Sequence, residues 1–291
     1  MHAASLPLSG KTALITGVSR RRGIGFSVAR ELADRGANVF IQHFRPHDLD
    51  QPWGGDDLDL VRSELRAASG PTARFGDVEA DLSDRHAATA VLGAAEALTG
   101  TVDILVCNQA KSGGDGSILD MTADSLDAHW AVNARATLLL TAEFARSKNP
   151  VADGAARRPG ERIDSGKPFA EPTGKVFWMT SGQLHGPMRG EIAYATSKAG
   201  LAGVTATVAA ELLELGIVLN TIDPGPVNTG YMDPDSTDRS LDALEQHLAT
   251  TPFGRYGHPS DPANLIGWLA TDSGSWIVGQ VLTSDGGFSL E

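Results

Sequence analysis

The stretch "TSGQLHGPMRGEIAYATSK", residues 180–198, contains the residues best suited to proton chemistry. Tyr194 and Lys198 are four positions apart, so they share one face of a helix. A tyrosine hydroxyl has an unperturbed pKa of about 10, which is too high for easy proton exchange near neutrality. A neighbouring ammonium group favours the phenolate and should lower that pKa. The pair could act as a general acid and base, and Ser181 could hydrogen-bond an oxygen that gains negative charge.

A glycine loop is the second chemical signal. It reads "TGVSRRRGIG" (16–25), follows the apolar run "TALIT" and precedes a helix predicted over 24–36. Gly17 allows a tight turn, Gly25 permits close packing of helix on strand, and the helix N-terminus offers free N–H groups to a pyrophosphate. In this context the loop predicts a dinucleotide-binding site, the alternative being a plain glycine-rich turn.

The end of the second apolar run bears on the choice of dinucleotide. An NAD site would place a carboxylate there to receive the ribose 2′-hydroxyl. The run instead ends "QHFRPHD", with His43 at that position and no carboxylate before Asp48. Guanidinium groups bind phosphate bidentately and stay charged, so we predict that NADP(H) is preferred, with NAD(H) as the alternative. The arginines predicted to hold the 2′-phosphate are Arg20, Arg21, Arg22 and Arg45, the alternative for each being a solvated surface charge.

Short β-rich runs alternate with helical patterns along the chain, which implies βαβ units and a parallel sheet. Most runs are continuously apolar, as expected of strands that are covered on both faces. The sequence therefore predicts an α/β fold: a single doubly wound Rossmann-type domain over residues 1–291 with a seven-stranded parallel sheet. Ser83 is predicted to cap a helix over 84–98. The predicted strands are residues 12–16, 38–44, 73–80, 102–108, 174–181, 217–223 and 280–286.

Two segments interrupt this alternation. Residues 148–173 are rich in Pro, Gly and charge and have almost no apolar periodicity, which predicts a surface insertion. Residues 230–252 contain a short amphipathic pattern with Leu241, Leu244 and Leu248 on one face. Because this second segment follows the sixth predicted strand, on the side where ligands bind in such sheets, it is predicted to be a substrate lid.

Composition restricts the class of partner. The formal net charge of −12 argues against nucleic acid and anionic membranes, since both require a positive field. Cys107 is the only cysteine, so an intrachain disulfide is excluded, and we expect this residue to lie in the core. The chain start has no signal-peptide pattern, which leads us to expect a cytoplasmic protein. The histidines lack the spacing of metal ligands, so no metal site is predicted.

Four motifs together resemble the short-chain dehydrogenase/reductase family, particularly members related to 3-oxoacyl-carrier-protein reductase. The glycine loop resembles the family's TGxxxGxG, lengthened here by two residues, and "DILVCNQA" (103–110) resembles DILVNNAG. "NTIDPGPVNTG" (220–230) resembles the family's N-x-x-x-PG segment. Ser181 precedes Tyr194 by thirteen residues, which is the family's spacing between its serine and YxxxK. The resemblance covers the whole chain apart from 148–173.

The resemblance implies contacts around the dinucleotide. Asp81 would meet the adenine, Lys198 the nicotinamide ribose and Val227 the nicotinamide carboxamide, while Asn108 would steady the sheet. The implied cofactor-binding residues are Gly17, Ser19, Arg20, Arg21, Arg22, Gly23, Ile24, Gly25, Arg45, Asp81, Leu82, Asn108, Gln109, Ala110, Tyr194, Lys198, Pro224, Gly225, Val227 and Thr229.

The resemblance also implies a reaction. In the reduction of a ketone, Tyr194 would donate the proton and Ser181 would bind the developing oxyanion. Asn133, in "VNARATLLLT", would support a water relay leading to Lys198. We therefore expect an NADPH-dependent reductase of a ketone or 3-oxoacyl compound. The residues predicted to border this small-molecule substrate are Gln183, Met188 and Tyr231.

Two other functions stay open on the sequence. One is an NAD(P)-dependent alcohol or sugar dehydrogenase of the same fold, and the other is a nucleotide-binding sensor without catalysis. Sensors of this kind typically lose the tyrosine or the lysine, whereas both are present here. Family members are commonly tetramers, so the resemblance also implies a homo-oligomer, with a tetramer favoured.

Overall fold

The structure is a computed structural model, and it describes residues 6–149, 160–162, 168–237 and 240–290. Its centre is a parallel sheet with the strand order β3-β2-β1-β4-β5-β6-β7. Each strand falls within one of the predicted runs, so the predicted α/β fold and parallel sheet are confirmed. The strands are β1 (Thr12–Ile15), β2 (Asn38–His43), β3 (Phe75–Glu79), β4 (Ile104–Cys107), β5 (Gly174–Met179), β6 (Ile217–Asp223) and β7 (Val281–Thr283).

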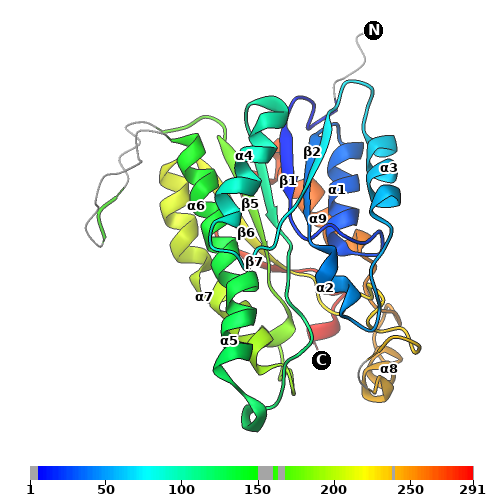
Figure 1. Cartoon of the computed structure of the whole chain (residues 1–291). Coiled ribbons are helices and arrows are strands. Elements are labelled where there is room, and N and C mark those ends of the chain that lie inside the picture. The colour runs from blue at the N-terminus through cyan, green and yellow to red at the C-terminus, as the bar shows by residue number, and fades with distance from the viewer. Residues whose placement is uncertain (1–5, 150–159, 163–167, 238–239, 291) are drawn as a thin grey trace.

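Helices cover both faces of the sheet (Figure 1). Their bounds are α1 (Ile24–Asp34), α2 (Arg45–Leu49), α3 (Leu58–Ala68), α4 (Ala87–Thr99), α5 (Ala123–His129), α6 (Ala136–Lys148), α7 (Ile192–Glu214), α8 (Asp242–Leu248) and α9 (Ser260–Ala270). A π-helical turn, Trp130–Arg135, joins α5 to α6. Helices α1, α3 and α9 lie on one face, and α4, α6 and α7 lie on the other.

Alternating strand side chains build a separate core on each face. Phe177 packs in the core beneath α1 and α9, whereas its neighbour Trp178 packs in the core beneath α4, α6 and α7. The same division separates Ile15 from Leu14 on β1. It arises because successive strand residues point to opposite faces of a sheet. Burial on both faces explains why the strands read as continuous apolar runs.

The strand order reverses at the centre of the sheet, where β1 pairs with β2 on one side and with β4 on the other. The chain segments leaving β1 and β4 therefore turn to opposite faces, and a crevice opens between them at the carboxyl ends of the strands. The glycine loop leaves β1 at this point, and residues 108–110 leave β4. The fold thus brings two of the sequence motifs to one edge of the sheet.

Some predictions on individual segments are changed. Helix α4 begins at Ala87 with His86 as its N-cap, so the prediction that Ser83 caps this helix was wrong. Ser83 donates its backbone N–H to the Asp81 side chain instead, at 2.8 Å. Helix α8 lies within residues 230–252, and Leu241 and Leu248 are buried there as the amphipathic pattern predicts. Most of the predicted insertion, residues 150–159 and 163–167, lies outside the described residues.

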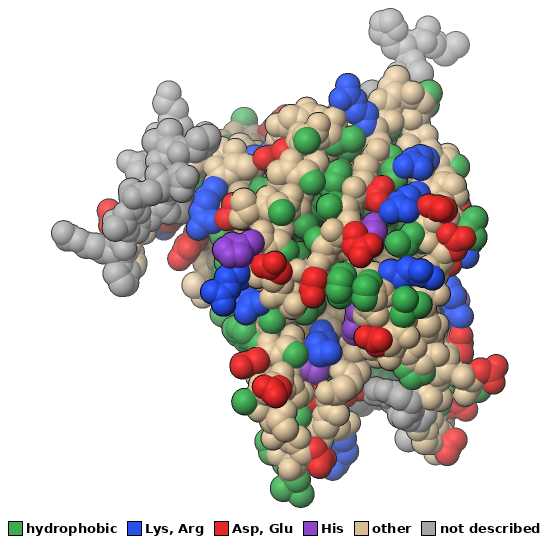
Figure 2. Space-filling view, viewed as in Figure 1, with side chains coloured by type: hydrophobic (Ala, Val, Ile, Leu, Met, Phe, Trp, Pro, Cys, Tyr) green, Lys and Arg blue, Asp and Glu red, His purple; other side chains and the backbone are tan. Residues whose placement is uncertain are grey.

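Charges of both signs are interspersed on the face of the molecule shown in Figure 2. That face has no extended basic area, which agrees with the formal net charge of −12. Within the part of the chain that the structure describes, no helix is long and apolar enough to cross a membrane.

Apolar side chains on the outer surface bear on the expected self-association. Val204 and Leu213 on α7 and Trp268 on α9 are exposed, and Trp276 is 97% exposed. Exposed apolar surface often marks contacts between protein chains. We therefore expect light scattering to report a multiple of the 30.5 kDa chain mass, with a tetramer favoured. The mass of a single chain at micromolar concentration would contradict this expectation.

Candidate active site

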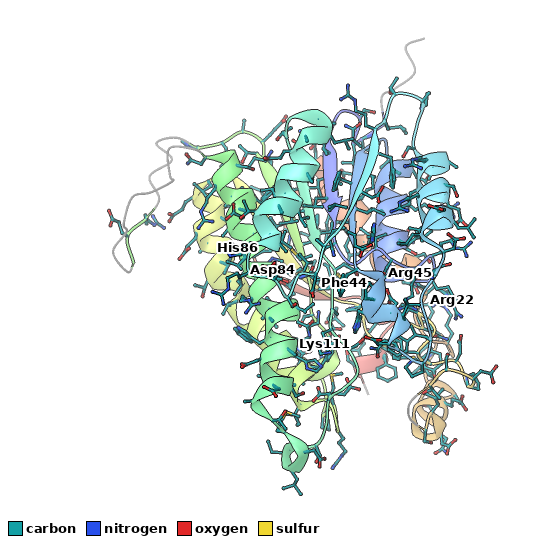
Figure 3. All side chains as sticks on the ribbon, in the orientation of Figure 1. Arg22, Phe44, Arg45, Asp84, His86 and Lys111 are labelled. Atoms are coloured by element: carbon teal, nitrogen blue, oxygen red, sulfur yellow. The ribbon has the colours of Figure 1, made fainter. Side chains whose placement is uncertain are left out.

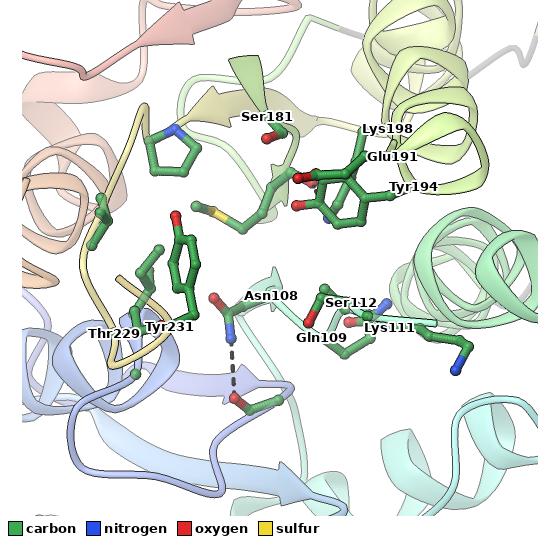
Figure 4. A pocket seen from close by; sticks show the side chains of 18 of the residues that line it. Asn108, Gln109, Lys111, Ser112, Ser181, Glu191, Tyr194, Lys198, Thr229 and Tyr231 are labelled. Atoms are coloured by element: carbon green, nitrogen blue, oxygen red, sulfur yellow. Dashed lines mark hydrogen bonds between the residues drawn. The ribbon is translucent and has the colours of Figure 1, made fainter. Parts of the chain in front are cut away.

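A pocket of about 1150 Å³ lies at the carboxyl ends of the strands. Its wall is formed by the glycine loop, the residues after β4 and β5, the start of α7 and the chain after β6 (Figure 4). The predicted site residues that line it are Gly17, Ser19, Arg20, Gly23, Ile24, Asp81, Leu82, Asn108, Gln109, Ala110, Ser181, Met188, Tyr194, Lys198, Pro224, Gly225, Val227, Thr229 and Tyr231. The predicted residues outside this lining are Arg21, Arg22, Gly25, Arg45, Asn133 and Gln183.

Ser181, Tyr194 and Lys198 meet on one side of the pocket (Figure 4). Ser181 follows the end of β5, while the other two lie in the first two turns of α7. The Lys198 Nζ donates to the Met179 carbonyl at 2.9 Å and lies 5.7 Å from the centre of the Tyr194 ring. The Ser181 hydroxyl is close enough to Tyr194 to lower the pKa of the phenol. The hydroxyl groups of Tyr194 and Ser181 therefore lie close to the ammonium group of Lys198 on the same side of the pocket.

Burial controls the charge of these groups. Desolvation raises the pKa of Tyr194 to about 12, although part of the residue faces the pocket, and the bond from Ser181 offsets only some of this effect. The pKa lowering expected from the lysine is therefore not found. Desolvation also lowers the pKa of Lys198 to about 8, because an ammonium group is costly away from water. Near neutrality Tyr194 consequently keeps its proton.

Asp115, which sequence analysis missed, holds the start of α7. Its carboxylate accepts the backbone N–H of Tyr194 at 2.7 Å and that of Ala193 at 3.1 Å. These are two of the N–H groups that a helix start leaves without a partner inside the helix. The cap comes from the loop after β4 rather than from the residue before the helix, so no local capping pattern in the sequence could reveal it. Asp115 thus fixes the backbone from which the Tyr194 ring projects.

Asn133 lies beside the pocket within the π-helical turn. Its Oδ1 accepts the Lys111 backbone N–H at 2.6 Å, and its Nδ2 donates to the Lys111 carbonyl at 3.1 Å and to the Ser197 hydroxyl at 3.0 Å. A π turn carries one more residue than an α-helical turn and is frequent at functional sites. Here it directs the fully buried carboxamide of Asn133 toward Ser197 on α7, the residue that precedes Lys198. Asn133 therefore links the residues after β4 to α7.

The glycine loop fits a dinucleotide. Gly17 has φ +70°, and a Cβ there would lie 2.7 Å from the Gln109 backbone. A Cβ at Gly25 would lie 2.5 Å from the Asn108 Nδ2, which donates to the Gly17 carbonyl at 3.1 Å. The N-cap of α1, Gly23, makes no side-chain cap, so the helix start presents backbone N–H groups to the pocket. This cradle of close backbone and N–H donors suits a pyrophosphate.

The structure places the four arginines predicted to hold the 2′-phosphate in different surroundings. Only Arg20 lines the pocket, with its Nε 2.9 Å from the Asp48 carboxylate and its Nη1 donating to the Thr229 carbonyl at 2.8 Å. Arg21 and Arg22 turn to carboxylates outside the pocket lining. Arg45 begins α2 and also lies outside the lining. Figure 3 labels Arg45 and Arg22 on the side of the molecule that carries α2. The predicted clamp of four arginines therefore reduces to a single guanidinium at the pocket.

Asp48 is a second residue that sequence analysis did not place in the site. It is buried, lines the pocket, accepts a hydrogen bond from the Ser19 hydroxyl and pairs with Arg20. His43, where an NAD site would have its acid, is buried instead beside Asp77, with its Nε2 at 3.2 Å from that carboxylate. The short helix α2 brings Asp48 into contact with the glycine loop. The sequence alone did not lead us to expect this contact.

His185 and Asp223 form another pair in the pocket lining. The His185 Nε2 lies 3.2 Å from the Asp223 carboxylate and 3.1 Å from the Thr283 hydroxyl. Asp223 ends β6, is fully buried, and has its pKa raised by that burial. Gln183, predicted to border the substrate, instead donates to the Thr180 hydroxyl at 3.0 Å. The residue two positions further along the chain, His185, takes its place at the pocket.

A parallel sheet with a glycine loop at its reversal point, together with serine, tyrosine and lysine at the same pocket, defines an NAD(P)-dependent oxidoreductase. Comparison with known proteins agrees: a family model described as enoyl-(acyl carrier protein) reductase matches residues 17–155 and 162–289. The chain belongs to the short-chain dehydrogenase/reductase family.

Relatives match along nearly the whole chain. An uncharacterized oxidoreductase of Bacillus subtilis, YjdA, is 35% identical over 279 residues, which cover 96% of each chain. A chloroplastic NADPH-dependent aldehyde reductase-like protein of Arabidopsis thaliana is 30% identical, covering 97% of this chain and 96% of its own. The solved structure of a short-chain dehydrogenase/reductase from Serratia marcescens has a TM-score of 0.75 at 27% identity, covering 97% of this chain and 99% of that one.

Proposed function

We propose that the protein reduces a ketone or 3-oxoacyl carbonyl to a secondary alcohol with NADPH. The observation that carries this proposal is the position of Tyr194 beside Lys198 and Ser181, in the same pocket as the glycine loop. A carbonyl oxygen that gains charge during reduction needs a proton and a hydrogen-bond donor, and the pocket offers both. Fold alone would not indicate this chemistry, because the same architecture supports many functions.

The glycine loop and Lys198 would hold the dinucleotide, which when bound would supply the hydride needed at the carbonyl carbon. The Ser181 hydroxyl donates a hydrogen bond to the carbonyl oxygen and holds it next to the Tyr194 hydroxyl. Tyr194 gives its proton to that oxygen as charge develops, and the nearby Lys198 ammonium stabilises the phenolate that results. Lys198 would also bind the nicotinamide ribose hydroxyls. In the oxidative direction the Tyr194 phenolate would take the proton back.

Asn133 would help to bring a proton from solvent back to Tyr194 after each turnover. Its carboxamide holds the Lys111 backbone and the Ser197 hydroxyl, and Ser197 precedes Lys198. A water bound along this edge would lead to the Lys198 ammonium and onward to Tyr194. Such a relay matters because each turnover consumes a proton, and Tyr194 must regain one before it can act again.

Arg20 supports the preference for NADPH. It is the loop arginine at the pocket, and its charge and planar donor geometry suit the 2′-phosphate. The end of β2 offers His43 and Phe44 rather than a carboxylate that would repel this phosphate. The Arabidopsis relative carries NADPH in its name. Asp48 pairs with Arg20, so the 2′-phosphate and the Asp48 carboxylate would both have to contact the Arg20 guanidinium.

We expect Arg20→Ala to weaken NADPH binding and to leave NADH binding nearly unchanged. A charge-assisted phosphate contact contributes roughly 1.5–3 kcal/mol, so the loss of NADPH affinity should be about ten- to a hundredfold. Arg21→Ala is the matched control, because its guanidinium pairs with Asp56 and Glu64. Fluorescence titration with each dinucleotide measures both effects. Tighter binding of NADH than of NADPH by the unmodified protein would reverse the proposed preference.

A substrate panel tests the proposed reaction. Ketones and 3-oxoacyl thioesters are assayed for NADPH oxidation by the loss of nicotinamide absorbance, and alcohols and sugars for NADP⁺ reduction by its gain. Turnover of a carbonyl compound supports the proposal, whereas turnover confined to alcohols or sugars would favour a dehydrogenase. Dinucleotide binding with no turnover of any class would indicate a nucleotide-binding sensor.

A further inference from the structure

The three arginines of the glycine loop face two different directions. Arg20 and Arg22 contact the chain after β6, the former through the Thr229 carbonyl and the latter through an ion pair of 2.8 Å with Asp233. Arg21, between them, donates to Asp56 at 2.8–2.9 Å and to Glu64 on α3 at 3.0 Å. Alternate arginines of the loop therefore reach the chain after β6, whereas the middle one, Arg21, points away from that chain toward Asp56 and Glu64.

Trp53 also takes part in the contact between the glycine loop and the chain after β6. The Arg20 guanidinium lies over its indole, 5.6 Å from the ring centre, and the Tyr231 ring meets it edge-on at 6.2 Å. A Cβ added to Gly230, which has φ +114°, would lie 3.6 Å from both the Arg20 Nη1 and the Trp53 Cβ. Residues 229–233, named here the docked segment, thus lie directly against the loop and the tryptophan.

The docked segment carries part of the substrate pocket. Thr229, Tyr231 and Asp233 are the residues that contact the loop or Trp53, while Tyr231 and Met232 line the pocket. In Figure 4 Tyr231 lies across the pocket from Tyr194. Anything that shifts the docked segment therefore moves the wall that faces the reacting carbonyl.

We propose that the arginine-rich loop and Trp53 dock residues 229–233, and that Arg20, Arg22 and Trp53 thereby act as positioning residues that set the substrate pocket. The loop is two residues longer than the TGxxxGxG motif, and the added length carries a guanidinium to Asp233. On this view the arginine run serves the carbonyl substrate as well as the cofactor. The docking itself is independent of the proposed function, on which only the kinetic part of its test rests.

The first test uses hydrogen exchange of the free protein, read by mass spectrometry over residues 229–233. Arg22→Gln and Asp233→Asn each remove one partner of the ion pair and should speed exchange in the docked segment. The charge swap Arg22→Asp with Asp233→Arg should restore slow exchange. The matched control Arg21→Gln removes the same charge one residue away and should leave exchange there unchanged. Equal acceleration by Arg21→Gln and Arg22→Gln would overturn the proposal.

The second test is kinetic. Because the pair is partly exposed, with Arg22 and Asp233 side chains 61% and 33% exposed, Arg22→Gln should raise KM for the carbonyl substrate only about two- to fivefold. Trp53→Ala removes the aromatic contact and should raise KM about tenfold or more, with kcat within about twofold of the unmodified value. Trp53→Phe keeps an aromatic ring and should stay close to the unmodified KM. An unchanged KM in Trp53→Ala would overturn the positioning role.

The two tests separate the docking from the proposed reaction. If exchange responds as expected but no carbonyl compound is reduced, the docking stands and the proposed function fails. If carbonyl reduction proceeds but the exchange of residues 229–233 is unchanged in the Arg22 and Asp233 variants, the docking fails and the proposed function stands. Should Trp53→Ala not fold, the charge swap at positions 22 and 233 still decides the outcome.

Discussion

Replacing Tyr194 by phenylalanine should abolish most turnover while leaving the dinucleotide bound. The substitution keeps the ring and its packing beside Lys198 and removes only the hydroxyl that donates the proton. General acid catalysis contributes typically 10²–10⁴-fold, so kcat for the best carbonyl of the panel should fall by at least about a hundredfold. NADPH affinity should hardly change, because the glycine loop, Arg20 and Lys198 are intact. Steady-state kinetics and a binding titration measure the two quantities.

Ser181→Ala is the companion variant. It removes the hydroxyl that holds the carbonyl oxygen and should lower turnover about 10²–10³-fold while sparing the dinucleotide. Loss of NADPH binding in either variant would indicate a folding defect, which circular dichroism would report. Full activity of Tyr194→Phe would exclude this residue as the acid, whatever substrate the protein takes.

The activity should fall as pH rises through about 8 because Lys198 then loses its charge. Burial lowers the pKa of Lys198 to about 8, so the ammonium is present below that pH and absent above it. Tyr194, with its pKa near 12, keeps its proton across this range. A plateau in kcat/KM at neutral pH should therefore give way above pH 8 to a decline of about tenfold per unit.

Two variants of Lys198 test this assignment. Lys198→Met removes the charge at similar length and should lower kcat/KM on the order of a hundredfold or more at neutral pH, with weaker dinucleotide binding. Lys198→Arg keeps a positive charge that does not titrate below about pH 12, so its residual activity should lose the decline above pH 8. A decline at the same pH in Lys198→Arg would mean that another group causes it.

Much of the fold was readable because its signals are local. Strands buried on both faces are largely apolar, as β4 is along its whole length, and such runs stand apart from polar surface segments. The i, i+4 spacing of Tyr194 and Lys198 likewise fixes their common helix face. A Cβ at Gly17 or Gly25 would clash with Gln109 or Asn108, so glycine is required at both positions. The glycines in the motif therefore indicate that the loop packs closely against the chain after β4.

The parts that sequence could not give depend on partners distant in the chain. Arg21 and Arg22 looked like phosphate ligands because Asp56, Glu64 and Asp233 do not neighbour them in sequence. The cap that Asp115 places on α7 and the return of Asp48 to the glycine loop are also tertiary contacts. The lowered pKa expected for Tyr194 failed for a related reason: the ammonium could be counted from the sequence, whereas the desolvation could not.

The π-helical turn at Trp130–Arg135 makes this helix sensitive to changes in chain length rather than in residue type. A helix that loses one residue turns its remaining part by about 100°, since 3.6 residues complete a circle. Deleting a single residue before Asn133 would let the turn relax to an ordinary α-helix, and the carboxamide would then leave Lys111 and Ser197. Point substitutions on the outer side of the same turn would leave that alignment untouched. The one extra residue of the π turn thus sets the direction in which the Asn133 side chain points from the helix. Insertions or deletions should therefore be tolerated far less here than in the polar stretch that follows α6.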